Sequence, residues 1–167
     1  GLMKIGEKGG IVPILSRFVG PFFSRLFPEV PRNHPATGSI IMNFSANILG
    51  LDNAATPLGL KAMKELQEIN PDKETASNAQ IMFLVLNTSG LTVIPISIIA
   101  DRATLGSLNP TSIFIPTLIA TFRSTLVGLI YISVKQKINL FDPVIIAYVL
   151  GLTSLVLLGV WYFASLS

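Results

Sequence analysis

The sequence contains no cysteine and little charge. None of its 167 residues is a cysteine, and Asp, Glu, Lys and Arg together make up 13% of it. The absence of cysteine excludes disulfides, thiolate metal sites and cysteine nucleophiles. Soluble domains carry about 25% charged residues, whereas 50% of this chain is hydrophobic and its mean hydropathy is +0.65. We therefore expect an all-α integral membrane protein with several membrane-spanning helices.

The sequence also lacks the motifs of catalysis, cofactor binding and nucleic-acid binding. It has no P-loop and no dinucleotide fingerprint. Its single histidine, His34, has no second metal ligand beside it. The 12 basic residues are scattered along the chain, so they indicate no basic patch for nucleic acid. We expect no enzymatic activity, no catalytic residue, no cofactor, no metal site and no bound nucleic acid.

Three hydrophobic segments are long enough to cross a membrane. A hydrocarbon core of about 30 Å takes about 20 apolar residues in a helix. Residues 113–134 and 143–164 each predict one such helix. Residues 76–100 are also apolar, but Asn87-Thr88-Ser89-Gly90 and Pro95 interrupt them. We expect a broken transmembrane helix there.

The chain before residue 36 differs from the rest. Residues 11–28 are apolar on most sides but contain Arg17 and Arg25. We expect one or two short amphipathic helices at the membrane interface, with the arginine side chains reaching toward the headgroups. The sequence predicts two parts, an interfacial segment over 1–35 and a membrane domain over 36–167.

The basic residues indicate whether residues 36–59 cross the membrane or turn back. If 76–100 crosses the membrane, the charged loop 60–75 and the loop 135–142 lie on the same side. Together the two loops contain five lysines. The loop 101–112 on the other side has a single arginine. The positive-inside rule places the lysine-rich side in the cytoplasm. Five more basic residues precede residue 36, and they stay inside only if the chain enters and returns on one side. We therefore expect a re-entrant hairpin.

Two polar breaks in the hydrophobic sequence share one order of residues. Backbone breaks at membrane depth persist only where protein packs around them or where they line a wet cavity. In repeat-built transporters, the ends of paired broken helices meet the substrate near the midplane. We expect the two breaks to border a cavity for a small polar solute. The residues of the two breaks are Asn47, Gly50, Leu51 and Pro57, and then Asn87, Gly90, Leu91 and Pro95.

Amide and hydroxyl side chains are the expected lining of this cavity. Ser39, Asn43 and Asn47 are four residues apart, which aligns them on one face of a helix. An amide both donates and accepts hydrogen bonds, so the stripe can bind a solute or join neighbouring helices. The sequence leaves both interpretations open. The candidate solute-binding residues are Asn43, Asn47, Asn53, Thr56, Asn87, Thr88, Ser89 and Arg123.

Arg123 lies in the middle of the apolar segment 113–134. A charge at the bilayer centre costs from about 3 to more than 10 kcal/mol, and it indicates a functional residue. The alternative is a structural clamp to Asp52, to Asp101 or to a helix C-terminus. Small residues at intervals of four predict a close helix contact on the same segment. These small residues are Ala120, Ser124 and Gly128.

Two runs of sequence resemble a known family. They are PEVPRNHPATGSIIMNFSANILGLDNAATPLGLKAMKELQEINP (28–71) and NAQIMFLVLNTSGLTVIPISIIADRA (78–103). Both are similar to the Gate, or nucleoside-recognition, domain family, and within it to the spore maturation protein A type. The residues that match the family pattern are Asn43, Ser45, Asn47, Asn53, Thr56, Pro57, Asn87, Thr88, Ser89 and Pro95.

The resemblance implies a Gate-type membrane domain in a multi-pass protein of the bacterial inner membrane. It implies a partner in the bilayer, either a homologous protein of the spore maturation protein B type or further copies of the same chain. It also implies a hydrophobic segment upstream, so we expect the chain to be part of a longer protein. We expect a transporter-like module that binds or passes a small polar solute. The alternative is a non-transporting assembly subunit.

Overall fold

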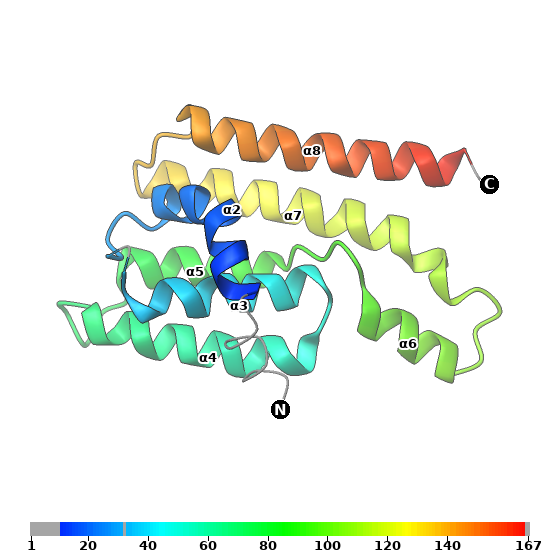
Figure 1. The fold of residues 1–167 in the computed structure, drawn as a ribbon, viewed down its shortest axis with the longest axis horizontal. Helices are drawn as coiled ribbons and strands as arrows, with labels where there is room; N and C mark the ends of the chain where they lie inside the picture. The colour runs from blue at the N-terminus through cyan, green and yellow to red at the C-terminus, as the bar shows by residue number, and fades with distance from the viewer. Residues whose placement is uncertain (1–10, 32, 166–167) are drawn as a thin grey trace.

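The computed structural model describes residues 11–31 and 33–165, and all regular structure in these residues is helical (Figure 1). The all-α class expected from the sequence is confirmed for this part of the chain. In chain order the helices are α2 (Ile11–Leu26), α3 (Pro35–Ile48), α4 (Asp52–Ile69), α5 (Asn78–Ser89), α6 (Ile96–Thr104), the 3-10 helix η1 (Pro110–Ile113), α7 (Phe114–Lys135) and α8 (Pro143–Ala164).

Helices α3 and α4 form an antiparallel hairpin, the most extensive helix contact in the structure (Figure 1). Proline at the first helical position suits the start of α3, because its missing N–H would have no helical partner there. The Nδ1 atom of His34 accepts a hydrogen bond from the Ala36 N–H at 3.2 Å and caps the same end. The turn between the helices centres on Gly50. Both ends of the hairpin therefore lie at one end of the bundle.

Helix α4 continues beyond the hairpin that the sequence predicts over 36–59. The charged stretch 60–75 has a short helical pattern in the sequence, and residues 60–69 do form a helix, the second half of α4, rather than a solvated loop. Apolar residues on one face of this helix are buried at intervals of three or four, which is the period of an amphipathic helix. The residues of that buried face are Ala55, Leu58, Ala62 and Leu66. Lys61, Lys64 and Glu68 lie on other faces and are exposed.

The predicted interruption of 76–100 is present. Helix α5 begins with a reciprocal capping box between Ser77 and Gln80. It ends at Gly90, which adopts the left-handed conformation with φ +60°, as glycines that follow a helix often do. Helix α6 begins directly after Pro95. The segment is two short helices joined by an irregular connection.

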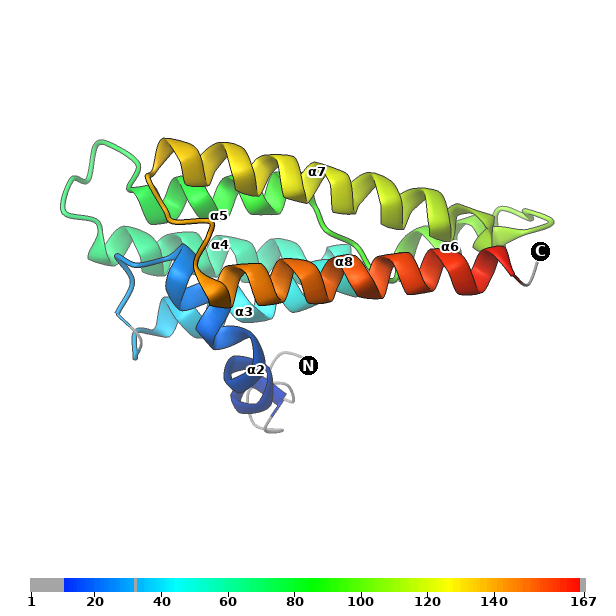
Figure 2. The same ribbon diagram turned by 90° about the horizontal axis from the view of Figure 1, so that it is seen from above.

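Helices α7 and α8 are the two long helices that the sequence predicts, and they run antiparallel (Figures 1 and 2). Each has 22 residues and spans about 33 Å. The apolar stretches Pro110–Lys135 and Pro143–Tyr162 are both long enough to cross a membrane. Within the most apolar part of each helix, only 17% of the residues of the first and 11% of those of the second are buried. A core helix of a soluble protein would be mostly covered. Most of their apolar surface faces outward.

One hydrophobic core joins α2 to the hairpin and to α5. The ring of Phe44 on α3 lies 5.0 Å from that of Phe23 on α2 and 5.9 Å from that of Phe83 on α5. Arg25 also pairs with Asp142, just before α8, at 3.2 Å. The described part of 11–28 is therefore one helix packed across α3 and α8 (Figure 2). Residues 1–10 and 32 of the predicted interfacial segment lie outside the described residues.

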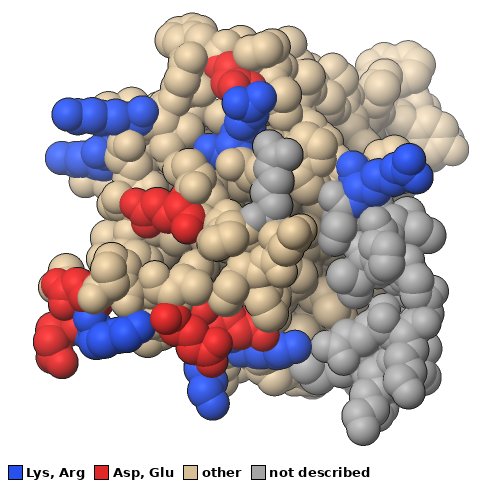
Figure 3. Space-filling view, turned by 60° about the vertical axis from the view of Figure 1, so that its left-hand side comes forward, with Lys and Arg blue, Asp and Glu red and all other residues tan. Residues whose placement is uncertain are grey.

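The two ends of the bundle differ in charge. The connections 27–31 with 33–34, 70–77 and 136–142 lie together at one end (Figure 1), and charged side chains gather there (Figure 3). In this end face, hydrogen bonds from Thr75 and from the backbone of Glu74 lower the pKa of the exposed Asp72 carboxyl. At the other end, the Arg102 guanidinium donates to the carbonyl oxygens of Pro110 and Asn109, both at 3.2 Å. These hydrogen bonds hold the loop that precedes α7 against α6.

Candidate functional site

The two predicted breaks pack directly against each other. The N–H groups of Val93 and Ile94 both donate to the Ile48 carbonyl oxygen, at 2.9 and 3.0 Å. Ser97 donates to the Gly50 carbonyl oxygen through its N–H at 3.3 Å and its Oγ at 2.6 Å. The last carbonyls of a helix have no partner within the helix. The second break therefore supplies the hydrogen bonds that the end of α3 lacks.

Gly50 makes this close approach possible. Its φ is +60°, a conformation that costs other residues about 1–2 kcal/mol. A Cβ at this position would lie 2.7 Å from the Ile94 carbonyl oxygen and 3.0 Å from the Pro95 Cα. These neighbours are backbone atoms of the second break and cannot rotate away. The glycine fixes the distance between the hairpin tip and the connection from α5 to α6.

Asparagine side chains connect the helices beside the breaks. The Asn47 Nδ2 on α3 donates to the Asn87 Oδ1 on α5 at 2.9 Å and to the Asn43 Oδ1 at 3.3 Å. The Asn43 Nδ2 donates to the Ala55 carbonyl oxygen on α4 at 2.8 Å. Asn43 is buried, with 2% of its surface exposed, and its Nδ2 lies 3.0 Å from where a Cβ of Gly59 would be. This asparagine chain, Asn43, Asn47 and Asn87, links three helices.

The face of α3 that carries the chain is not a simple solvent-facing stripe. Ser39 and Asn43 are buried, and so are Ile40 and Ile41 on the other side of the helix. Helix α3 is surrounded by α2, α4 and α5. Of the three residues in the predicted stripe, Asn47 is the one that is partly exposed.

The remaining candidate residues lie apart from the asparagine chain. Asn53, Thr56 and Thr88 are exposed. The Thr88 Oγ1 donates to the Leu84 carbonyl oxygen at 2.9 Å, and the Ser89 Oγ donates to that of Leu86 at 2.7 Å. Both hydroxyls are therefore engaged by their own helix. Hydrogen bonds join the candidate side chains Asn43, Asn47 and Asn87, and their role in solute binding stays a prediction.

Arg123 is exposed on α7. It forms no hydrogen bond or salt bridge with any side chain that the structure describes, and the side chain of Asp52 is not among those. Asp101, the other predicted partner, is exposed on α6. The predicted close helix contact is confirmed at Gly128, where a Cβ would lie 3.2 Å from the Val85 Cγ1 of α5. Ala120 and Ser124 take no part in it within this chain, because both are exposed.

Sequence reasoning missed two hydroxyl residues that hold the second break. Ser97 binds the hairpin tip as described above. Thr121 Oγ1 on α7 accepts from the Thr92 N–H at 3.2 Å, and its own hydroxyl lies 2.9 Å from the Thr117 carbonyl oxygen and 3.3 Å from that of Thr92. The position of Ser97 in the first turn after Pro95 was an available signal. Thr121 gives no comparable signal, since threonine is common in apolar helices.

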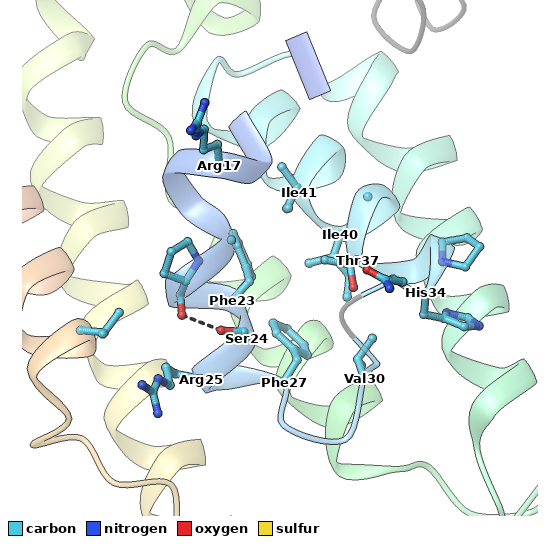
Figure 4. A pocket seen from close by; sticks show the side chains of 16 residues that line it. Arg17, Phe23, Ser24, Arg25, Phe27, Val30, His34, Thr37, Ile40 and Ile41 are labelled. Atoms are coloured by element: carbon cyan, nitrogen blue, oxygen red, sulfur yellow. Dashed lines mark hydrogen bonds between the residues drawn. The ribbon is translucent and has the colours of Figure 1, made fainter. Parts of the chain in front are cut away.

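A separate groove lies between α2, the residues Val30, Asn33 and His34, and the first half of α3 (Figure 4). Its volume is about 630 Å³. Phe23, Ile40 and Ile41 provide an apolar wall, and Arg17 and His34 lie on its border. The sequence did not predict it. Across the described residues, no three His, Asp or Glu side chains come together as a metal site.

The described residues define a helical bundle in which an antiparallel hairpin meets a broken helix at a polar contact. Comparison with known proteins identifies the class. The Gate family model, described as nucleoside recognition, matches residues 1–105, and the chain belongs to this family. The match includes both breaks and the asparagine chain but ends before α7. The resemblance noted from the sequence is confirmed.

A curated relative supports the same assignment. The chain is 48% identical over 124 residues to spore maturation protein A of Bacillus subtilis (strain 168). The alignment covers 74% of this chain and 63% of that protein, so the chain spans less than two thirds of its relative's length. No solved structure matches the chain significantly.

Proposed function

We propose that this chain is the membrane-embedded part of a transporter-like module that binds or passes a small polar solute where the two breaks meet. The observation that carries the proposal is the hydrogen bond between Asn47 and Asn87, which come from the two interrupted helices. Interrupted helices at membrane depth are typical of substrate sites in transporters. The family assignment is consistent with this interpretation.

The shape of the chain supports a multi-pass position in a bacterial inner membrane. Helices α7 and α8 are long and expose most of their apolar surface. The hairpin helix α3 has 14 residues, or about 21 Å, which is short of the hydrocarbon thickness of about 30 Å. A helix of this length that returns at Gly50 fits a re-entrant hairpin with its tip inside the membrane. The printed name of the relative, spore maturation protein A, is consistent with a role in spore maturation.

The polar groups favour a neutral or anionic solute. The asparagine chain offers amide donors and acceptors, and divalent cations such as Ca²⁺ take carboxylate oxygens in addition to neutral oxygens. The Asn47–Asn87 bond is partly exposed, so a solute could replace it with bonds to both amides. The exposed Asn53, Thr56 and Thr88 would extend the path from this point.

The test uses the full-length protein purified from its own membrane. Polar small molecules released from the wild type are identified by mass spectrometry and compared with those from Asn47→Leu and Asn87→Leu. We expect a bound compound that both leucine variants lose and that a control, Asn109→Leu at the far loop, retains. If both variants stay folded and release the same compound in the same amount as the wild type, the proposed site is wrong.

A second candidate function is a non-transporting assembly subunit. The specific observation in its favour is that the asparagine groups bond to one another and to the backbone, as interhelical contacts do. Under this alternative, the asparagines support the shape that binds a spore maturation protein B-like partner or further copies of this chain. Asn47→Leu would then lose the bound subunit, and no solute would be found in the wild type.

A further inference from the structure

Arg123 has an unusual position on α7. It is 13 residues from Pro110 and 12 from Lys135, the ends of the apolar stretch. At 1.5 Å per residue, each end is about 18–20 Å away along the helix. The arginine side chain is far shorter than that distance, so it cannot reach the headgroups at either end by extending along the helix.

The outward direction of Arg123 follows from its neighbours. The face of α7 that contacts the rest of the chain is buried, and its residues are Leu118, Phe122, Leu129 and Ile132. Arg123 lies instead on the face where apolar side chains are uncovered. The residues of this outward face are Val127, Ile130, Tyr131 and Val134, which are 52–68% exposed. No side chain that the structure describes gives the guanidinium an ion pair.

In a bare bilayer this position of Arg123 costs from about 3 to more than 10 kcal/mol, and a molecule that covers the face removes that cost. This step rests on the proposed function, which places α7 across the bilayer. A guanidinium at mid-depth that faces hydrocarbon is very unfavourable, and such residues pair with acids or with backbone carbonyls of neighbouring helices. Asp142 already pairs with Arg25. Asp101 is exposed on α6, a different helix. Among the described side chains no acid pairs with Arg123, so we look to a covering molecule for the acceptor.

We propose that a transmembrane helix of a second, different membrane subunit covers the outward face of α7 and places a carboxylate against Arg123. Arginine and carboxylate form paired, charge-assisted hydrogen bonds that suit a dry contact. The exposed Ala120 and Ser124 border Arg123 and allow the second helix to approach closely. A symmetric contact between two copies would instead bring two Arg123 side chains together, which charge repulsion opposes.

These 167 residues contain no cysteine, so the test needs only that any cysteine elsewhere in the full-length protein is first changed to serine. Val127→Cys, one turn from Arg123, and Leu157→Cys, on the exposed face of α8, are made in the full-length protein and expressed in its own host. Each carries a thiol-attached photo-crosslinker, and adducts formed in the membrane are identified by mass spectrometry. We expect the Val127 variant to label a transmembrane peptide that contains Asp or Glu and belongs to a different protein. The Leu157 control is expected not to label that peptide.

Charge variants distinguish a paired arginine from a neighbouring one. Adding Arg123→Leu to the Val127→Cys variant should lower this adduct at least about tenfold, because it leaves the partner's carboxylate unpaired. Arg123→Lys should retain more of it than Arg123→Leu. Arg123→Glu should abolish it, and changing the labelled Asp or Glu to Arg in the same cells should restore it.

Several results would overturn the inference. Among them are adducts with lipid alone, adducts with another segment or further copies of this same protein alone, a labelled helix without an acid, and an adduct that Arg123→Leu leaves unchanged. Alkaline carbonate extraction of the wild type separates the two proposals. If carbonate releases the chain from the membrane, both fail. If the chain stays in the membrane and one of these results is obtained, the proposed subunit contact alone is wrong.

Discussion

The hairpin region, α3 to α5, and the outer pair, α7 and α8, differ in how far their apolar side chains are buried. In the hairpin region, side chains such as Ile40, Leu66 and Phe83 are almost completely buried by other parts of the chain. Along the outer pair, large apolar side chains such as Leu157 and Trp161 are mostly exposed. The first region is organised by contacts within the chain, whereas the second needs an apolar environment that the chain does not provide.

Polar groups follow the same division. Asn43, Asn47 and Asn87 find hydrogen-bond partners within the hairpin region, while Arg123 on α7 has none among the described side chains. The asparagines of the hairpin region are therefore satisfied by this chain itself, whereas Arg123 needs a partner from outside the described residues. Changes in the hairpin region should alter the stability of the isolated protein. Substitutions on the outward face of α7 should alter the contacts of this protein with other molecules in the membrane.

A matched pair of leucines gives the largest expected difference between the two regions. Leu66→Ala removes a side chain with 0% exposure and should lower the free energy of unfolding by about 2–5 kcal/mol, because a cavity remains in the core. Leu157→Ala, at 63% exposure, should change it by less than about 0.5 kcal/mol. Denaturant unfolding of the purified protein in one detergent measures both. Equal effects of the two substitutions would contradict the contrast between a buried hairpin region and an exposed outer pair.

A pair of glycines tests whether the tip contact fixes the hairpin. Gly50→Ala places a Cβ against the Ile94 carbonyl oxygen and strains a positive φ, so unfolding should become easier by about 2–4 kcal/mol. Gly38→Ala, also in the hairpin, has nothing within 4 Å of its new Cβ and should stabilise α3 by about 0.5–1 kcal/mol. The same unfolding assay applies. A Gly50→Ala protein as stable as the wild type would mean that the two breaks do not pack together.

The smallest expected effect concerns the bond between the two breaks. A double-mutant cycle of Asn47→Ala and Asn87→Ala should give a coupling energy of about 0.6–2 kcal/mol, the range for polar contacts between membrane helices. The control cycle pairs Asn47→Ala with Asn109→Ala, and its effects should add within about 0.5 kcal/mol. If the Asn47–Asn87 cycle is equally additive, the hydrogen bond contributes nothing to holding the breaks together.

Much of the helical framework could be predicted from the sequence. The two continuous apolar segments became α7 and α8, and the Gly90 and Pro95 signals marked the break between α5 and α6 correctly. The basic residues favoured a re-entrant hairpin over 36–59, and the antiparallel pair α3–α4 is consistent with one, but its position in a membrane stays a prediction. These features follow from local rules, namely hydrophobic length, turn residues and charge distribution.

The contacts between distant parts of the chain could not be predicted in the same way. The continuation of α4 to Ile69 had a signal, the buried period of Leu58, Ala62 and Leu66, which the charges between them obscured. The bond from Asn47 to Asn87 crosses 40 residues, and an amide pattern alone does not say whether its partner is a solute, water or another amide. Backbone donors such as the Val93 N–H have no mark in a sequence at all.

The contact between the hairpin tip and the second break also sets an order of events during synthesis. The Ile48 carbonyl receives its hydrogen bonds from Val93 and Ile94, which the ribosome adds 45 residues later. At about 5–20 residues per second, that interval is several seconds. Until it ends, α3 and α4 can pair, but the Ile48 carbonyl at the end of α3 lacks these two N–H donors. The nascent hairpin is therefore incomplete until the α5–α6 connection has been made.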